Sequence, residues 1–209
     1  MRVPFHHSTN HRADAVRAKF LVRLISLLLF AFASPVFVQA QPAVAHDTLV
    51  LVEFPTAACA GLWPILRLEL EQSKTPKLLG GSVVWMTRDE FHESMEFRLI
   101  YQIKLRGDCR IDASSNTQDT SGTPLGWVFM VNEHIQPFVY VDCDRLVQML
   151  HRDLRNKPTS ERKRILARAI SRIVVHEMTQ IVTQSALHAT GGLQKAHVTP
   201  YDLLAYHTE

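Results

Sequence analysis

The feature that most constrains the fold is a long amphipathic segment in the C-terminal half of the chain. Pro158 followed by Thr159 or Ser160 is typical of a helix start, and helical spacing then continues to about Gln184. At 1.5 Å per residue, such a helix is about 37 Å long. Its buried stripe is predicted to contain Ile165, Ala169, Ile173, His176 and Gln180. The basic residues at positions 162, 163, 164, 168 and 172 are predicted to form its solvated face.

The remaining segments predict strands before helices. Strands are expected at 48–54, 82–86 and 96–105, and a hairpin at 126–131 and 138–142 with its turn at 132–134. Further helices are expected at 61–72 and 144–154, and a last one is expected to start at Thr199, Pro200 and Asp202. A polar loop is expected from Asp112 to Pro124. This order predicts an α+β fold whose C-terminal half is helical.

Residues 1–40 have the layout of a secretory signal peptide. A basic segment reaches Arg23, an apolar run extends from Leu24 to Ala33, and Val38 to Ala40 suit a signal peptidase. We therefore expect an exported protein, periplasmic or secreted, in which residues 41–209 form one domain. An uncleaved signal anchor is the alternative, although the run is shorter than the roughly 20 apolar residues that span a bilayer. No later segment is apolar enough to span a membrane.

Loss of the signal peptide also removes the basic character of the chain. The whole sequence has a net charge of +3, but residues 1–40 contain five of the Lys and Arg residues and only one acid, Asp14. The remainder is close to neutral, whereas a phosphate-binding surface needs a surplus of Lys and Arg. We therefore expect no nucleic-acid partner.

An exported protein enters an oxidising compartment, in which one pair of its three cysteines, Cys59, Cys109 and Cys143, can form a disulfide. Cys109 and Cys143 lie at the edges of predicted strands, and their disulfide would contribute on the order of 3 to 4 kcal/mol in the chain-entropy model. Cys59 would then be left free. Three pairings are possible, and the sequence does not choose among them.

The segment from 172 to 197 contains the residues that point most clearly to chemistry. His176 and Glu177 occupy the first two positions of the zinc-peptidase pattern HExxH, in which two histidines one turn apart hold the metal and the glutamate activates water. Gln180 stands at the position of the second histidine. His188 follows beyond the helix end, where a third ligand could fold back, and His197 and His207 are further imidazoles.

This segment resembles the zincin-type metallopeptidases, in particular a group of exported bacterial proteins, many of them acidobacterial. The matching residues are His176, Glu177, His188, Gly192, Lys195 and Ala196. The resemblance extends with less specific matches through LRGDCR, LGW and PFVYVDCDR. It implies a zincin-like mixed sheet packed on an active-site helix, one zinc ion and peptide-bond hydrolysis.

The chain departs from this family at Gln180, because an amide oxygen replaces the imidazole nitrogen that zinc prefers. If zinc binds, His176 and His188 hold it with Gln180 as a poor ligand, and Glu177 is the catalytic base. We expect a weakly active or inactive metallopeptidase-like protein. The first alternative is a pseudopeptidase that binds a peptide or protein partner in the former substrate cleft. The second is a structural domain in which the His-Glu pair is coincidental and His176, Gln180 and His188 do not converge.

Overall fold

The computed structural model describes residues 46–80, 82–112, 124–188 and 197–205. By its internal contacts the chain divides into Met1–Ala43 and Val44–Glu209, and all described elements belong to the second unit. The expected signal peptide lies outside the described residues. Most of the expected polar loop, the glycine-rich segment with Gly192, Lys195 and Ala196, and His207 also lie outside them.

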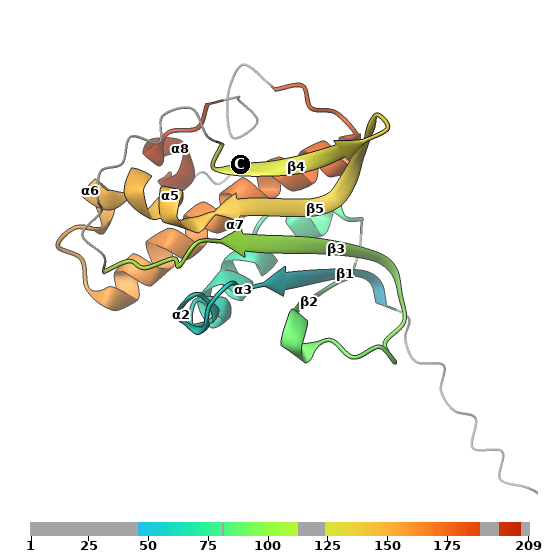
Figure 1. The fold of residues 1–209 in the computed structure, drawn as a ribbon, viewed down its shortest axis with the longest axis horizontal. Coiled ribbons are helices and arrows are strands. Elements are labelled where there is room, and N and C mark those ends of the chain that lie inside the picture. Colours follow the sequence, from blue (N-terminus) through green and yellow to red (C-terminus); the bar gives the residue numbers. More distant parts are fainter. Residues whose placement is uncertain (1–45, 81, 113–123, 189–196, 206–209) are drawn as a thin grey trace, which may run out of the picture. The chain divides into compact units, whose positions relative to one another are not determined.

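A five-stranded mixed sheet forms one layer of this unit, in the order β2-β1-β3-β5-β4 (Figure 1). Its strands are β1 (His46–Glu53), β2 (Val83–Thr87), β3 (Phe97–Arg106), β4 (Gly126–Val131) and β5 (His134–Asp142). β1 pairs in parallel with β2 and β3, and β3 in parallel with β5. Only β4 is antiparallel, and it forms one edge of the sheet.

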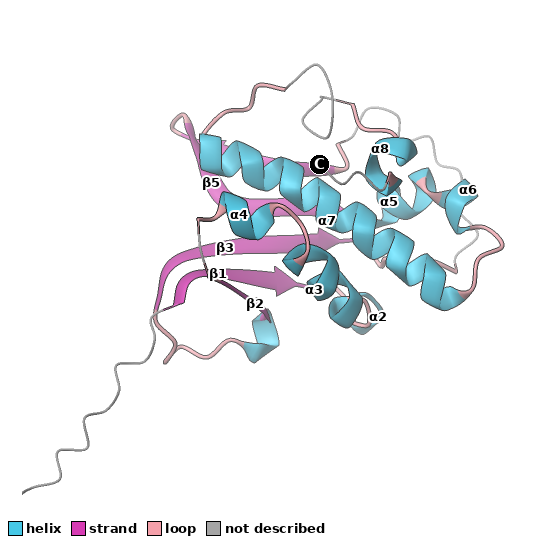
Figure 2. Ribbon diagram, turned by 180° about the vertical axis from the view of Figure 1, so that it is seen from behind, coloured by secondary structure: helices cyan, strands magenta, loops and turns pink. Residues whose placement is uncertain are grey.

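The helices cover one face of this sheet (Figure 2). The longest, α7 (Thr159–Thr183), runs diagonally across the strands, with α3 (Trp63–Glu71) beside it. The other helices are α2 (Ala57–Ala60), α3 (Trp63–Glu71), α4 (Thr75–Leu78), α5 (Cys143–Met149), α6 (His151–Leu154) and α8 (Pro200–Leu204), and a 3-10 turn η1 covers Arg88–Glu90. The core lies between the layers, where Val50, Val52 and Ile103 of the sheet meet Ile170, Val174 and Met178 of α7.

The architecture confirms the predicted α+β class with a mixed sheet and a helical C-terminal half. The predicted hairpin is also confirmed: β4 and β5 are joined at Asn132 and Glu133, whose φ angles are 50° and 66°. Positive φ at both central residues matches the twist of the adjoining strands. The last helix has the predicted capping box, in which Thr199 and Asp202 exchange hydrogen bonds.

The prediction of one buried stripe on α7 was too narrow. Every residue from Ile173 to Met178 is buried, because the sheet covers one side of the helix and α3, α4 and α8 pack elsewhere around it. The predicted solvated basic face is wrong at its C-terminal end. The guanidinium of Arg172 donates to the carbonyls of Asp202 and Ala205, and so attaches α8 to α7.

Gln184 ends α7 in the left-handed conformation and fixes this end to the sheet. Its amide group donates to the carbonyl of Ile135 and accepts from the Ile135 N–H, at 3.1 and 2.9 Å. The second half of α7 is therefore held against the β4–β5 hairpin. No helix in the described parts of the chain is both long and apolar enough to cross a bilayer.

Candidate functional site

The second half of α7 carries three polar side chains into the core. His176, Glu177 and Gln180 are 7%, 5% and 7% exposed. Polar groups are costly to bury unless they find hydrogen-bond partners, so a cluster of this kind in an apolar layer needs a specific arrangement. His176 and Gln180 share a helical face because they are one turn apart.

His188 returns to this face after the helix ends, as the sequence predicts for a third ligand. Its ring lies 5.3 Å from that of His176 between centroids, at an interplanar angle of 24°. Gln180 lies between the two histidines: its Nε2 is 3.1 Å from His176 Nε2 and 3.3 Å from His188 Nε2. His176, Gln180 and His188 therefore converge, contrary to the alternative of a coincidental motif.

The Gln180 amide satisfies both imidazoles at once. The amide NH₂ group has two N–H donors and no acceptor, so this arrangement requires each ring to accept at Nε2, as in the tautomer whose proton is on Nδ1. A metal ion would need the same two Nε2 lone pairs. Among the described residues, no buried side-chain nitrogen or oxygen lacks a hydrogen-bond partner. The amide nitrogen thus occupies the position between the rings where a cation would have to lie.

Glu177 lies beside His176, with Oε1 3.9 Å from His176 Nε2. Burial raises the pKa of its carboxyl from the ordinary value of 4.5 to about 7, because desolvation disfavours the charged form. Because Glu177 is buried, it does not make an i,i+4 or capping contact on an exposed helix face. A buried carboxyl of this kind at a pocket is a candidate functional group.

Gly126 allows the close approach of β4 to this part of α7. A Cβ at position 126 would overlap Ile173 Cγ2 and would lie 3.1 Å from Glu177 Oε1. Sequence reasoning assigned Gly126 only to the start of a strand. The helix contact is long-range, so the sequence contains no local signal of it.

A pocket of about 410 Å³ opens beside these residues. β4 and β5 form one wall, α5 contributes Arg145 and Met149, and His176, Glu177, Gln180 and His188 lie on another side. His197 also lines the pocket, so one of the two additional imidazoles considered from the sequence does reach the site. The pocket combines apolar walls with a few converging polar groups, as small-ligand and peptide sites do.

The donor set does not fit tight zinc binding. Zinc sites in proteins use three or four nitrogen, sulfur or carboxylate ligands, whereas the two imidazoles that converge here are both engaged by an amide nitrogen. Glu177 and His197 line the same pocket but do not complete with them a group of three ligand atoms within 4.8 Å of one another. Among the described residues, the one group of three or more His, Cys, Asp or Glu ligand atoms lying within 4.8 Å of one another is formed by the cysteines.

The cysteines are arranged differently from the sequence expectation. The sulfur of Cys109 lies beside that of Cys143, its predicted partner. The sulfur of Cys59, which was predicted to be left free, also lies beside that of Cys109. The reason is that α2, which follows β1, brings Cys59 to the carboxyl ends of β3 and β5.

No protein-family model, curated protein or solved structure matches this chain. The resemblance to zincins therefore stays a prediction from the residues of the motif.

A Glu177→Gln variant should change how stability depends on pH. The folded-state pKa of about 7 lies above the ordinary 4.5, so the folded chain holds this proton more tightly than the unfolded chain. The wild type should therefore lose up to about 3 kcal/mol of unfolding free energy, relative to the variant, as pH rises from about 4 to about 8.

Urea unfolding followed by circular dichroism at several pH values measures this difference. Glu93→Gln, at an exposed position, is the matched control and should keep the wild-type profile. Parallel profiles for the wild type and Glu177→Gln would show that Glu177 has no raised pKa.

Proposed function

We propose that this protein is a pseudopeptidase: a zincin-like scaffold that binds peptide segments in the pocket beside α7 and does not hydrolyse them. The hydrogen bonds of Gln180 to His176 and His188 carry the proposal. His176 and His188 stand at two of the metal-ligand positions that the resemblance implies. Here the Gln180 amide bonds to both rings in place of a metal ion. Hydrolysis by a zincin needs a metal-bound water, and this donor set does not favour a bound metal.

The position of the site in the fold supports zincin descent. The resemblance implies a mixed sheet packed on an active-site helix, and here a mixed sheet lies on α7. Glu177 faces the pocket from that helix, where the family has its catalytic base. The convergence of His176 and His188 on one atom counts against a purely structural domain.

The edge strand supports a peptide as the ligand. β4 is the terminal strand of the sheet, so its outer backbone edge has no ladder partner among the described strands. Trp127, Val128 and Met130 of this strand line the pocket. An extended peptide that added to β4 would make main-chain hydrogen bonds and could place a side chain in the pocket. With the expected signal peptide, we propose that such a partner is met outside the cytoplasm.

Restoring the histidine should restore the metal. Gln180→His removes the bridging amide and completes three imidazoles, so we expect about one zinc per chain in the variant and no stoichiometric zinc in the wild type. Elemental mass spectrometry of protein exported from the full chain and purified without a histidine tag measures both. Gln72→His, which adds a histidine at an exposed position outside the pocket, is the control.

Stoichiometric zinc in the wild type would contradict the proposal. Peptidase activity of the wild type would then be measured, with Glu177→Ala as the inactive control. A folded Gln180→His variant that stays free of zinc would remove the support for zincin descent.

Peptide binding should be visible at Trp127, because this residue lies on the edge strand β4 and lines the pocket. Peptides selected from a random library on the immobilised protein should change tryptophan emission, and Trp127→Phe should remove that change while Trp63 and Trp85 keep their own emission. Mass spectrometry should recover the bound peptides intact after long incubation. Cleaved peptides would contradict a non-catalytic role, and failure to select any binder would contradict a peptide site.

A further inference from the structure

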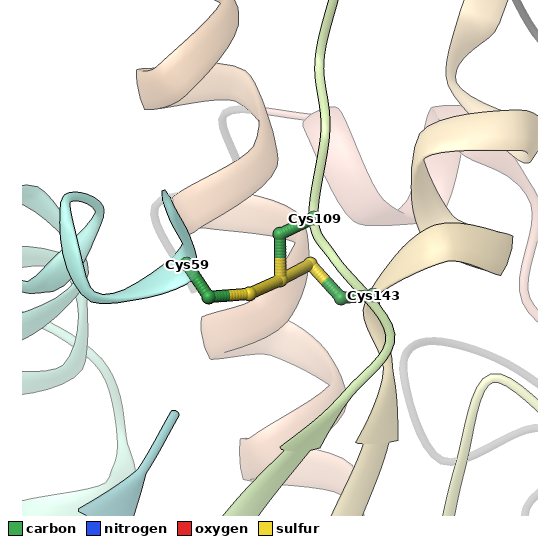
Figure 3. A group of neighbouring side chains, drawn as sticks. All are labelled: Cys59, Cys109 and Cys143. Carbon is green, nitrogen blue, oxygen red and sulfur yellow. A yellow bond between two sulfur atoms is a disulfide. The ribbon is translucent and has the colours of Figure 1, made fainter. Parts of the chain in front are cut away.

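Three cysteines from distant parts of the chain lie together at the carboxyl ends of the parallel strands. The parallel strands β1, β3 and β5 are neighbours, so their carboxyl ends lie together. Cys143 directly follows β5, Cys109 lies in the turn after β3, and Cys59 lies in α2, which follows β1. Figure 3 shows the side chain of Cys109 between those of Cys59 and Cys143.

The turn after β3 holds Cys109 in this central place. Gly107 and Cys109 have φ angles of 84° and 52°, in the left-handed region that a cysteine seldom adopts. Asp144 stabilises the turn, because its Oδ1 accepts hydrogen bonds of 2.9 Å from the N–H groups of Asp108 and Cys109. A Cβ at Gly107 would overlap the Asp144 carboxylate, so a glycine is required there.

Cys109 has bonding geometry toward both neighbours. Its Cα lies 5.4 Å from that of Cys59 and 5.0 Å from that of Cys143, and both separations suit a disulfide. The three Sγ atoms all lie within 4.8 Å of one another, and all three residues are buried. A disulfide sulfur bonds to only one other sulfur, so oxidation of this cluster leaves one thiol beside one disulfide.

We propose that Cys109 exchanges its disulfide partner between Cys59 and Cys143. In one direction the Cys59 thiolate attacks Cys109 Sγ, the Cys59–Cys109 bond forms, and the Cys109–Cys143 bond breaks. The electron pair leaves on Cys143 Sγ, which takes up a proton as Cys59 loses one. The exchange needs no net oxidant. The first disulfide requires a two-electron oxidant, for which a disulfide of another protein suffices by being reduced to a dithiol.

The exchange changes which helix is covalently attached to the turn after β3. The Cys109–Cys143 bond attaches α5, which contributes Arg145 and Met149 to the pocket. The Cys59–Cys109 bond attaches α2 and leaves α5 held at this point by the Asp144 hydrogen bonds. One wall of the pocket is therefore covalently fixed in one isomer and not in the other. The exchange itself does not depend on what the pocket binds.

Trypsin separates the three cysteines, which makes the proposal testable in the wild-type protein. They fall in the peptide ending at Arg67, in 107–110 and in 111–145. The full chain is expressed in an export-competent host, and the folded protein is acidified to stop exchange. It is then unfolded, its free thiols are alkylated, and it is digested and mapped by mass spectrometry. We expect one alkylated cysteine per chain, shared between Cys59 and Cys143, and both linkages in the same sample.

Single variants give the matched controls. Cys59→Ser should contain only the Cys109–Cys143 linkage and Cys143→Ser only the Cys59–Cys109 linkage, each without a free thiol. For the wild type, the two isomers are separated at acidic pH and each is returned to mildly alkaline pH without air. Each should regenerate the other.

One linkage alone in the wild type would overturn the proposal, and so would isomers that do not interconvert. Three reduced thiols, with or without a soft metal ion detected by elemental mass spectrometry, would overturn it equally. Because the mapping uses the wild type, poor folding of a serine variant does not affect the outcome.

Discussion

The burial of α7 between the sheet and the smaller helices is the constraint on which the rest of the structure depends. The helix is 25 residues long and more than half of its residues are buried, so it supplies much of the core. Its second half lies against β4 and β5, and Gly126 removes the side chain that would keep strand and helix apart. The polar residues of that half are consequently carried into the interior, where each must find a partner. The site is a product of this packing as much as of its own chemistry.

Gln180 supplies a hydrogen-bond partner for the buried imidazole of His176 and also bonds to His188, which is exposed. A buried imidazole such as that of His176 costs free energy if it has no partner, and a zinc ion is one way to satisfy it. An amide with two donors is another, since it needs no metal and leaves neither ring unpaired. In the zincin descent that we propose, a glutamine at the second histidine position therefore also gives the two remaining imidazoles a hydrogen-bond donor. This pairing is the reason why we propose peptide binding rather than hydrolysis.

The sequence predicts local structure well here and long-range placement less well. The hairpin, the start of α8 at Thr199 and the extent of α7 follow from turn residues, a capping box and helical spacing, all of which act within a few residues. The fold-back of His188 was also predicted, from its distance beyond the helix. The bridging role of Gln180 was not, because it depends on where His188 comes to rest. The contact of Cys59 with Cys109 depends on the order of the parallel strands, which hydrophobic periodicity does not reveal. The hydrogen bonds from Arg172 to the α8 segment depend on how that segment packs against α7.

The most direct test of the central claim is the protonation of the two imidazoles. A long-range proton–nitrogen correlation spectrum of nitrogen-labelled protein reports the tautomer of each histidine, and Gln180→Ala assigns the signals that depend on the amide. We predict that His176 and His188 are both neutral, with the proton on Nδ1 and a hydrogen-bonded Nε2, and that equimolar zinc leaves both unchanged. A shift of both Nε2 signals on addition of zinc would show that the histidines hold a metal despite Gln180, and would contradict the account.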